Sequence, residues 1–285
     1  MTLKKETGKF KSQEGWIAYH RVLCDESFFH FVRVVGGYSK QGGIVTRHIH
    51  YPLCKFAQDP KELRTAIAMP RDWLKSTVFT KWKAIWDYLQ DQEHRILIAS
   101  ENERIAGDFL YWVQQQILSN ELLRLLYSDI LCYFHPDGDL RPIDRAYTRM
   151  FRWSRTAMDL PRIGKYSEPS MRAIGIRGAA QSGHYTIIHI DDLVGESAME
   201  SELVLGDVFR WFDNCYELLV QPDWTQPDAS KIEMVGTHWG PGDFFCYVQE
   251  RYPEFKWRIV PCQRDTSLED TKNITYVQRD DIPDG

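Results

Sequence analysis

Short apolar runs that alternate with amphipathic segments are the feature that most constrains this chain. From about residue 45, TAIAM (65–69), RILIAS (95–100), MRAIGI (171–176), TIIHI (186–190) and KIEMV (231–235) each have the length of a buried strand. Between the first two runs, Val78, Phe79, Trp82, Ile85, Trp86 and Leu89 share one helical face. Such alternation predicts βα units, and therefore an α/β fold with a mainly parallel central sheet flanked by helices.

Three further segments are expected to be helical. Residues 16–35 predict one helix, which GGYSKQGG (36–43) ends. Ser100 and Glu103 have the spacing of a capping box that opens a second helix. A third is expected over 199–219. The chain is thus divided into an N-terminal helical or lid segment (1–44), the α/β domain (45–260) and a polar linker (261–285).

Composition limits the class of protein. The net charge of −5 over 285 residues gives no overall nucleic-acid signature, so any DNA contact must be local or come from a partner. The six cysteines are far apart and form no C-x-x-C motif, which favours reduced, buried thiols. No apolar run approaches the roughly 20 residues of a membrane span, and the N-terminus has no signal-peptide core. These features favour a soluble intracellular protein.

The stretch MPRDWLKST (69–77) follows the first predicted strand and precedes a helix, which is the context of a phosphate-binding loop. The usual pattern is G-x-x-x-x-G-K-[ST], and here Met69 and Leu74 occupy the two glycine positions. Lys75 would reach the outer phosphates and the Ser76 hydroxyl would help to hold Mg²⁺. The alternative is a helix start that Ser76 or Thr77 caps.

Polar residues also follow two later strands. Asp191 and Asp192 end TIIHIDD, at the edge where open α/β sheets bind ligands. Asp191 would hold Mg²⁺ and Asp192 would orient a water molecule, unless both are solvated turn residues. Gly236-Thr237 in MVGTHW would sense the γ-phosphate, although this signal is weak alone. His48 and His50 have no further ligands at metal-site spacing and are interpreted as structural.

Arginines supply the remaining candidate chemistry. Arg71 lies within the loop, and Arg172 and Arg177 precede the TIIHI strand. Guanidinium groups match the oxygens of phosphate, but most arginines are simply solvated.

Taken in order, PRDWLKST, RILIASENERIAGDFL, SNELLRLLYSDI, EPSMRAIGIRG, TIIHIDDLVGE and MVGTHW resemble the ATPase part of the tailed-phage terminase large subunit. The resemblance covers roughly residues 45–250. That family often lacks the first glycine of the loop and carries an arginine four residues before the lysine, as Arg71 precedes Lys75. The resemblance implies a P-loop NTPase fold of the ASCE type, with a small helical lid from the two termini.

The resemblance also implies roles for individual residues. ATP would be bound by Pro70, Arg71, Asp72, Trp73, Leu74, Lys75, Ser76, Thr77, Gly236 and Thr237, and Mg²⁺ by Ser76 and Asp191. The catalytic candidates are Asp192, Glu196, Arg71 and Arg177. The family usually has Asp-Glu at the second motif, so Asp192 is one methylene shorter than expected and Glu196 is the reserve carboxylate. Arg177 would act on the nucleotide of a neighbouring subunit.

The implied function is an ATP-driven motor that moves double-stranded DNA into a viral procapsid in the host cytoplasm. Its partners would be DNA, the portal protein and the small terminase subunit. The assembled form would be a homo-oligomeric ring, expected to be a pentamer, with a monomer as the isolated state and no membrane contact. Nuclease activity is not expected in this chain. Two alternatives stay open: another P-loop translocase of the helicase type, and a catalytically weak nucleotide- or DNA-binding scaffold.

Overall fold

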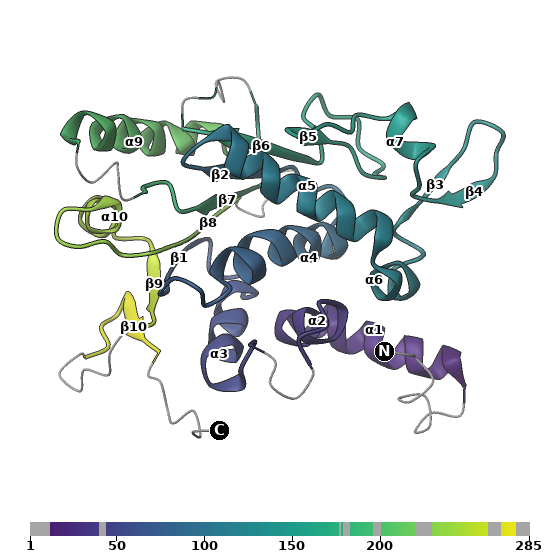
Figure 1. Cartoon of the computed structure of the whole chain (residues 1–285), viewed down its shortest axis with the longest axis horizontal. Helices are drawn as coiled ribbons and strands as arrows, with labels where there is room; N and C mark the ends of the chain where they lie inside the picture. Colours follow the sequence, from purple (N-terminus) through teal and green to yellow (C-terminus); the bar gives the residue numbers. More distant parts are fainter. Residues whose placement is uncertain are drawn as a thin grey trace.

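The computed structural model describes residues 12–39, 44–176, 178, 183–195, 201–220, 230–261 and 269–277. Its centre is an eight-stranded sheet in the order β10-β9-β1-β8-β7-β2-β6-β5. Every adjacent pair is parallel except β5 and β6, which are antiparallel. The predicted α/β class with a mainly parallel sheet is therefore confirmed (Figure 1).

The strands follow the apolar runs closely. The bounds are β1 Arg64–Ala68, β2 Ile96–Ser100, β5 Ala157–Met158, β6 Met171–Gly175, β7 Ile187–Asp191, β8 Lys231–Gly236, β9 Lys256–Ile259 and β10 Ile274–Tyr276. A separate antiparallel pair is formed by β3 Cys132–Phe134 and β4 Leu140–Pro142. Asp191 is thus the last residue of β7 rather than the first residue after it.

Helices cover both faces of the sheet. They are α1 Gln13–Glu26, α2 Phe28–Val35, α3 Arg47–Ala57, the π-helix η3 Thr77–Trp82, α4 Lys83–Gln90, α5 Glu103–Ser119, α6 Glu121–Leu126, α7 Tyr147–Met150, α9 Glu202–Cys215, the 3₁₀ turn η4 Tyr216–Leu218 and α10 Phe244–Arg251. Side chains alternate between two cores along the strands: Ile96 and Ile98 pack with α1 to α6, whereas Leu97 and Ala99 pack with α9 and α10.

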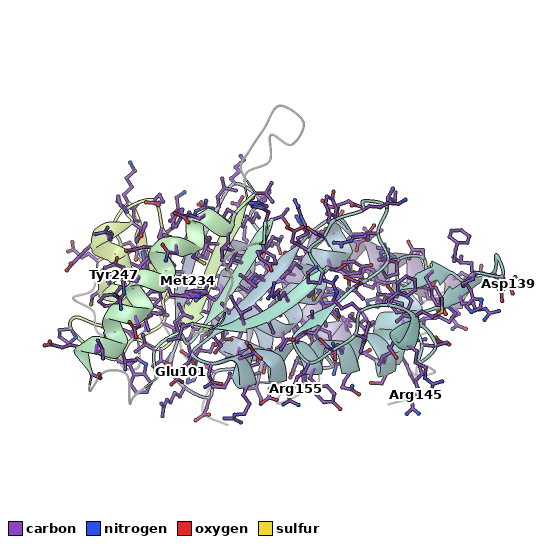
Figure 2. The ribbon with its side chains drawn as sticks, turned by 90° about the horizontal axis from the view of Figure 1, so that it is seen from above. Glu101, Asp139, Arg145, Arg155, Met234 and Tyr247 are labelled. Atoms are coloured by element: carbon purple, nitrogen blue, oxygen red, sulfur yellow. The ribbon has the colours of Figure 1, made fainter. Side chains whose placement is uncertain are left out.

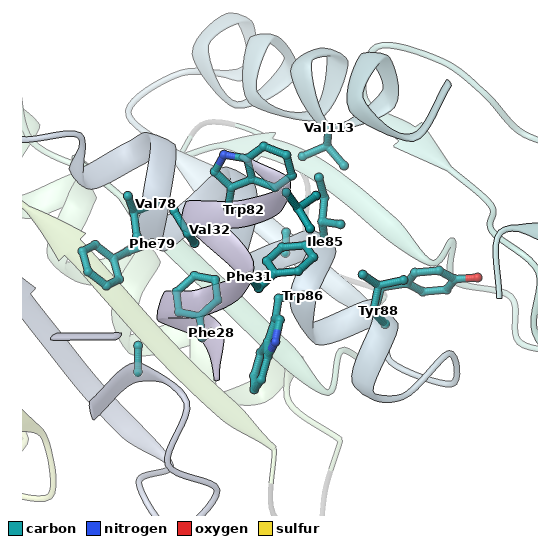
Figure 3. Packing of buried hydrophobic residues seen from close by; sticks show 14 of the residues in the cluster. Phe28, Phe31, Val32, Val78, Phe79, Trp82, Ile85, Trp86, Tyr88 and Val113 are labelled. Atoms are coloured by element: carbon teal, nitrogen blue, oxygen red, sulfur yellow. The ribbon is translucent and has the colours of Figure 1, made fainter. Parts of the chain in front are cut away.

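The N-terminal helices belong to the first of these cores. Phe31 packs edge-on against Trp82 with ring centroids 5.6 Å apart, and Phe28 lies 5.5 Å from Trp86 (Figure 3). The single helix predicted over 16–35 is wrong at Ser27. The backbone of Ser27 is extended, and its hydroxyl accepts from His30 N, so one helix ends there and another begins.

Three other boundaries differ from expectation. Asn102, not Ser100, caps α5, because its side chain accepts from Ile105 N while Ser100 still belongs to β2. The helix predicted over 199–219 is α9 followed by η4. The segment expected to be a polar linker contributes β10 to the edge of the sheet, paired with β9.

Candidate functional site

The polar motifs meet at one edge of the sheet because β1, β8 and β7 are parallel neighbours. Ala68 pairs in register with Gly236, and Asp191 pairs with Val235. The loop after β1, the residues after β8 and the acids of β7 therefore emerge side by side. This is the carboxyl edge at which open α/β sheets bind ligands.

The loop after β1 contains two non-glycine residues in the left-handed backbone conformation. Asp72 and Leu74 have φ of 67° and 58°. These are left-handed conformations that glycine adopts most easily. Leu74 occupies the second glycine position of the sequence pattern, and its backbone has a conformation that glycine favours. Turns of this kind aim N–H groups into a concave surface that suits an anion. Strained residues of this kind cluster at functional sites.

His50 of α3 supports this loop from outside. Its Nδ1 accepts from Thr46 N at 3.1 Å, and its Nε2 therefore donates to the Trp73 carbonyl at 3.1 Å. Burial lowers the pKa of His50, which favours the neutral ring that this pair of bonds requires. The sequence indicated a structural histidine but gave no sign of its contact with the loop.

Asp191 is fully buried beneath two hydroxyl groups. Its Oδ1 accepts from Ser76 Oγ at 2.9 Å and its Oδ2 from Thr80 Oγ1 at 2.5 Å. Thr80 lies in η3, and single π-helical turns are frequent at functional sites. Burial first, then the nearby Asp192, raises the pKa of Asp191 to about 7, against the opposing effects of Thr80, Ser76 and Lys75. Ser76 and Asp191, the two residues predicted to hold Mg²⁺, are therefore in direct hydrogen-bond contact.

Asp192 connects three segments of the edge. Its Oδ2 lies 2.9 Å from Lys75 Nζ, and its Oδ1 accepts from Thr237 N at 2.9 Å. Its backbone is strained, with φ of 41°. A Cβ at Gly236 would meet Asp192 Oδ1 at 3.0 Å and Phe245 Cζ at 2.9 Å, so glycine is required for this close approach. Thr237 Oγ1 is buried and bonds to none of the described protein groups.

Arg71 is exposed and points to the segment beyond β8. Its guanidinium lies 4.5 Å from the centre of the Trp239 ring, a cation–π distance. Trp239 is itself fixed, because its Nε1 donates to the Val194 carbonyl at 3.1 Å. The Arg71 side chain is thus exposed within the loop, and its guanidinium packs on the Trp239 ring.

The other predicted residues divide into three groups. Pro70 and Trp73 lie in the connection between β1 and η3, and Thr77 is the first residue of η3. Arg172 lies in β6, which β2 separates from β7, so it is not brought to the acids through the sheet. Arg177 and Glu196 lie outside the described residues.

Glu101 is a candidate that sequence reasoning missed. Ser100 pairs in register with Asp191, so Glu101 emerges from β2 at the same edge (Figure 2). Its Oε2 lies against the backbone after β7, 2.9 Å from the place of a Cβ on Gly195. Within the described part of the chain it makes no hydrogen bond or ion pair. Its position directly after a buried strand was the signal that could have found it.

The donor set at this edge suits a hard cation beside an anion. Ser76 and Asp191 offer the oxygen ligands that Mg²⁺ prefers, and Lys75 offers a positive charge. The void between Asp192, Thr237 and Trp239 holds only about 10 Å³. This void is therefore too small to hold a nucleotide.

No protein-family model matches the chain, and none of the curated proteins matches its sequence. Among the helices described, none combines the length and the apolar character that a bilayer crossing would need.

Proposed function

We propose that this chain is the ATP-hydrolysing motor domain of a viral terminase large subunit, which moves double-stranded DNA into a procapsid. The observation that carries the proposal is the convergence of Lys75, Ser76, Asp191 and Thr237 at one sheet edge, next to a strained loop. The proposal includes a P-loop NTPase fold of the ASCE type. The parallel order β1-β8-β7, which brings the loop, Thr237 and the two acids to one edge, supports it.

The proposed chemistry assigns each group one task. Lys75 would leave Asp192 and pair with the outer phosphates, which lie on backbone N–H groups of residues 70–77. Ser76 and Asp191 would hold Mg²⁺, which screens the phosphate charge when bound. Asp192, released from Lys75, would then be free to orient the attacking water. Glu196 stays the reserve carboxylate, and Glu101 becomes a third candidate. Thr237 would sense the γ-phosphate by a hydrogen bond from its hydroxyl, which has no partner among the described residues.

The remaining assignments follow from the terminase resemblance. Arg177 would act on a neighbouring nucleotide in a ring, expected to be a pentamer, mounted on the portal with the small subunit. Segments near the two termini would form a helical lid, and the host cytoplasm would be the location. Such an in-trans arginine is worth about 10³–10⁵ in rate, so an isolated subunit would hydrolyse ATP slowly.

The test is Mg²⁺-dependent ATP hydrolysis by Lys75→Ala beside Lys55→Ala. Lys55 is an exposed lysine of α3 and serves as the matched control. We expect Lys75→Ala to lose activity by at least about 10²-fold, because removing one preorganised charge contact costs that much, and Lys55→Ala to keep it. Unchanged turnover in Lys75→Ala would refute the assignment.

Two alternatives predict different outcomes. A helicase-type translocase would separate DNA strands without procapsid or portal. A scaffold with a degenerate loop would show no heat of binding for ATP or ADP in the presence of Mg²⁺.

A further inference from the structure

A second group of potential metal ligands lies just beyond β8, apart from the residues assigned to ATP and Mg²⁺. His238, Asp243 and Cys246 each offer one donor atom, and these three atoms all lie within 4.8 Å of one another. His238 follows Thr237, Asp243 caps α10, and Cys246 lies in the first turn of that helix. The chain therefore brings a nitrogen, an oxygen and a sulfur donor together within nine residues.

One pair of these donors has the spacing of two ligands of a tetrahedral ion. His238 Nε2 lies 3.6 Å from Cys246 Sγ, and His238 Nδ1 lies 3.6 Å from Asp243 Oδ2. A tetrahedral Zn²⁺ bound to nitrogen at about 2.0 Å and sulfur at about 2.3 Å holds those two atoms about 3.5 Å apart. The His238 Nε2 and Cys246 Sγ pair already has this separation. Asp243 Oδ2 faces the other ring nitrogen, so the partly exposed His238 ring has to turn for one ion to reach all three side chains.

The Asp243 carboxylate is held in a fixed orientation. Its side chain is 2% exposed, Oδ1 accepts from Cys246 N at 3.0 Å, and Oδ2 accepts from Trp239 N at 2.8 Å. Each oxygen keeps a lone pair after these bonds. Hydrogen bonds that fix a carboxylate in this way are typical of the surroundings of protein metal ligands.

A comparison inside the molecule shows why this group is distinctive. Asp87, His189 and Glu233 are equally close, but Lys83 Nζ lies 2.6 and 3.0 Å from their two carboxylates. A protein cation therefore already occupies that cluster. Among the residues described, no lysine or arginine pairs with Asp243.

We propose that His238, Asp243 and Cys246 bind one divalent transition-metal ion of the zinc type. Three protein ligands leave a fourth position for water, and the mixed nitrogen, oxygen and sulfur set favours Zn²⁺ over Mg²⁺. On binding, the Cys246 thiol releases its proton and forms the sulfur–metal bond. The ion joins the end of β8 to α10 and so fixes Trp239, on which Arg71 rests. This site is additional to the proposed ATPase function and does not depend on it.

The experiment titrates the nucleotide-free protein with Co²⁺ in a non-thiol reductant, recording the sulfur-to-cobalt absorption, and then displaces Co²⁺ with Zn²⁺. We expect one equivalent to bind, and both Cys246→Ser and His238→Ala to weaken binding by at least about tenfold. Cys132→Ser is the matched control. Cys132 is also partly exposed, but its Sγ faces the Asp129 carbonyl, so this variant keeps full affinity.

A second measurement keeps the proposal testable if a variant fails to fold. In the wild-type protein, Zn²⁺ should slow alkylation of Cys246, located by peptide mass spectrometry, and leave Cys132 unaffected. The site is refuted if Co²⁺ gives no sulfur absorption, or if Cys132→Ser loses as much affinity as Cys246→Ser. No nucleotide is present, so either result leaves the Lys75 test intact.

Discussion

Strands β7 and β8 carry two clusters of charged side chains that lie close together yet differ in almost every physical property. His189 and Asp191 are two residues apart in β7, so their side chains point to the same face of the sheet. Around His189, in the middle of the sheet, lie Lys83, Asp87 and Glu233. Around Asp191, at the end of the strand, lie Ser76, Thr80 and the Lys75–Asp192 pair.

The inner cluster is closed and internally matched. All four side chains are at most 8% exposed, and Lys83 contacts both carboxylates. The two ring nitrogens of His189 face Asp87 Oδ2 at 3.0 Å and Glu233 Oε2 at 3.3 Å. Burial works against the ionised form of Asp87, but Lys83 and His189 outweigh it, and the pKa of Asp87 lies below its usual value. The charges of this cluster thus compensate one another, although His189 Nδ1 makes no hydrogen bond to the described residues.

The outer cluster is incomplete. Among the described residues, the Asp191 side chain bonds only to hydroxyl groups, and its pKa is raised. Thr237 Oγ1 is buried without a described partner, and Leu74 and Asp192 have left-handed backbones. Such features cost free energy unless something else binds there. The contrast teaches that burial of charge alone does not mark a site. The two clusters differ in their counter-ion: Lys83 pairs with both inner carboxylates, whereas Asp191 forms no ion pair with the described residues.

The largest expected difference is in folding stability when each lysine is replaced by methionine. Lys83→Met leaves two buried carboxylates without their cation and should destabilise the fold by about 3–5 kcal/mol. Lys75→Met is the matched control. Its partner Asp192 is 36% exposed, so we expect about 1 kcal/mol or less. Urea unfolding monitored by tryptophan fluorescence measures both values. Equal losses in the two variants would remove the distinction between a closed and an open cluster.

The two clusters should also respond to pH with opposite sign. The lowered pKa of Asp87 gives stability that is complete above the unfolded value of about 3.9 and is lost as pH falls through the folded value. The pKa of Asp191, raised to about 7, means that the folded protein keeps a proton that the unfolded chain releases. The free energy of unfolding therefore decreases through Asp191 as pH rises from about 4 to 7.

Asparagine variants separate these contributions. In protein free of Mg²⁺ and nucleotide, Asp191→Asn should flatten the slope between pH 4 and 7, by at most about 1.4 kcal/mol per pH unit. Asp87→Asn should keep the slope between pH 4 and 7 unchanged, and it should remove the loss of stability that protonation of Asp87 causes at acid pH. Unfolding by urea at a series of pH values measures both, and parallel curves for the two variants would contradict the opposite signs.

Much of the outer cluster could be predicted from the sequence because it depends on strand ends. Apolar runs located β1, β2, β6, β7 and β8 to within one residue at either end, and parallel pairing then brought Lys75, Asp191 and Thr237 to one edge. The sequence motifs thus indicated which residues belong to the cluster, and the strand order of the sheet explains why they lie close together.

The inner cluster could not be predicted, since Lys83 and Asp87 look like solvated charges on an amphipathic helix. Only the packing of α4 against β7 and β8 buries them beside His189 and Glu233. The break at Ser27 and the strand β10 were missed for a similar reason. Each depends on a local cap or an edge pairing that the hydrophobic pattern does not encode.

The smallest expected effect is the difference in stability between Leu74→Gly and Leu74→Ala, and the sign of this difference is informative. A protein with glycine in the middle of a helix or strand is normally less stable than one with alanine there, by about 0.5–1 kcal/mol. At Leu74, with φ of 58°, alanine would keep the left-handed strain and lose the same contacts with the core, whereas glycine would relieve the strain. Leu74→Gly should therefore be more stable than Leu74→Ala by about 0.5–1 kcal/mol in urea unfolding. Leu205, partly buried within α9, is the control where alanine should be the more stable. If alanine is also the better residue at position 74, the loop holds no strain, and the outer cluster loses one of the features that set it apart from the inner one.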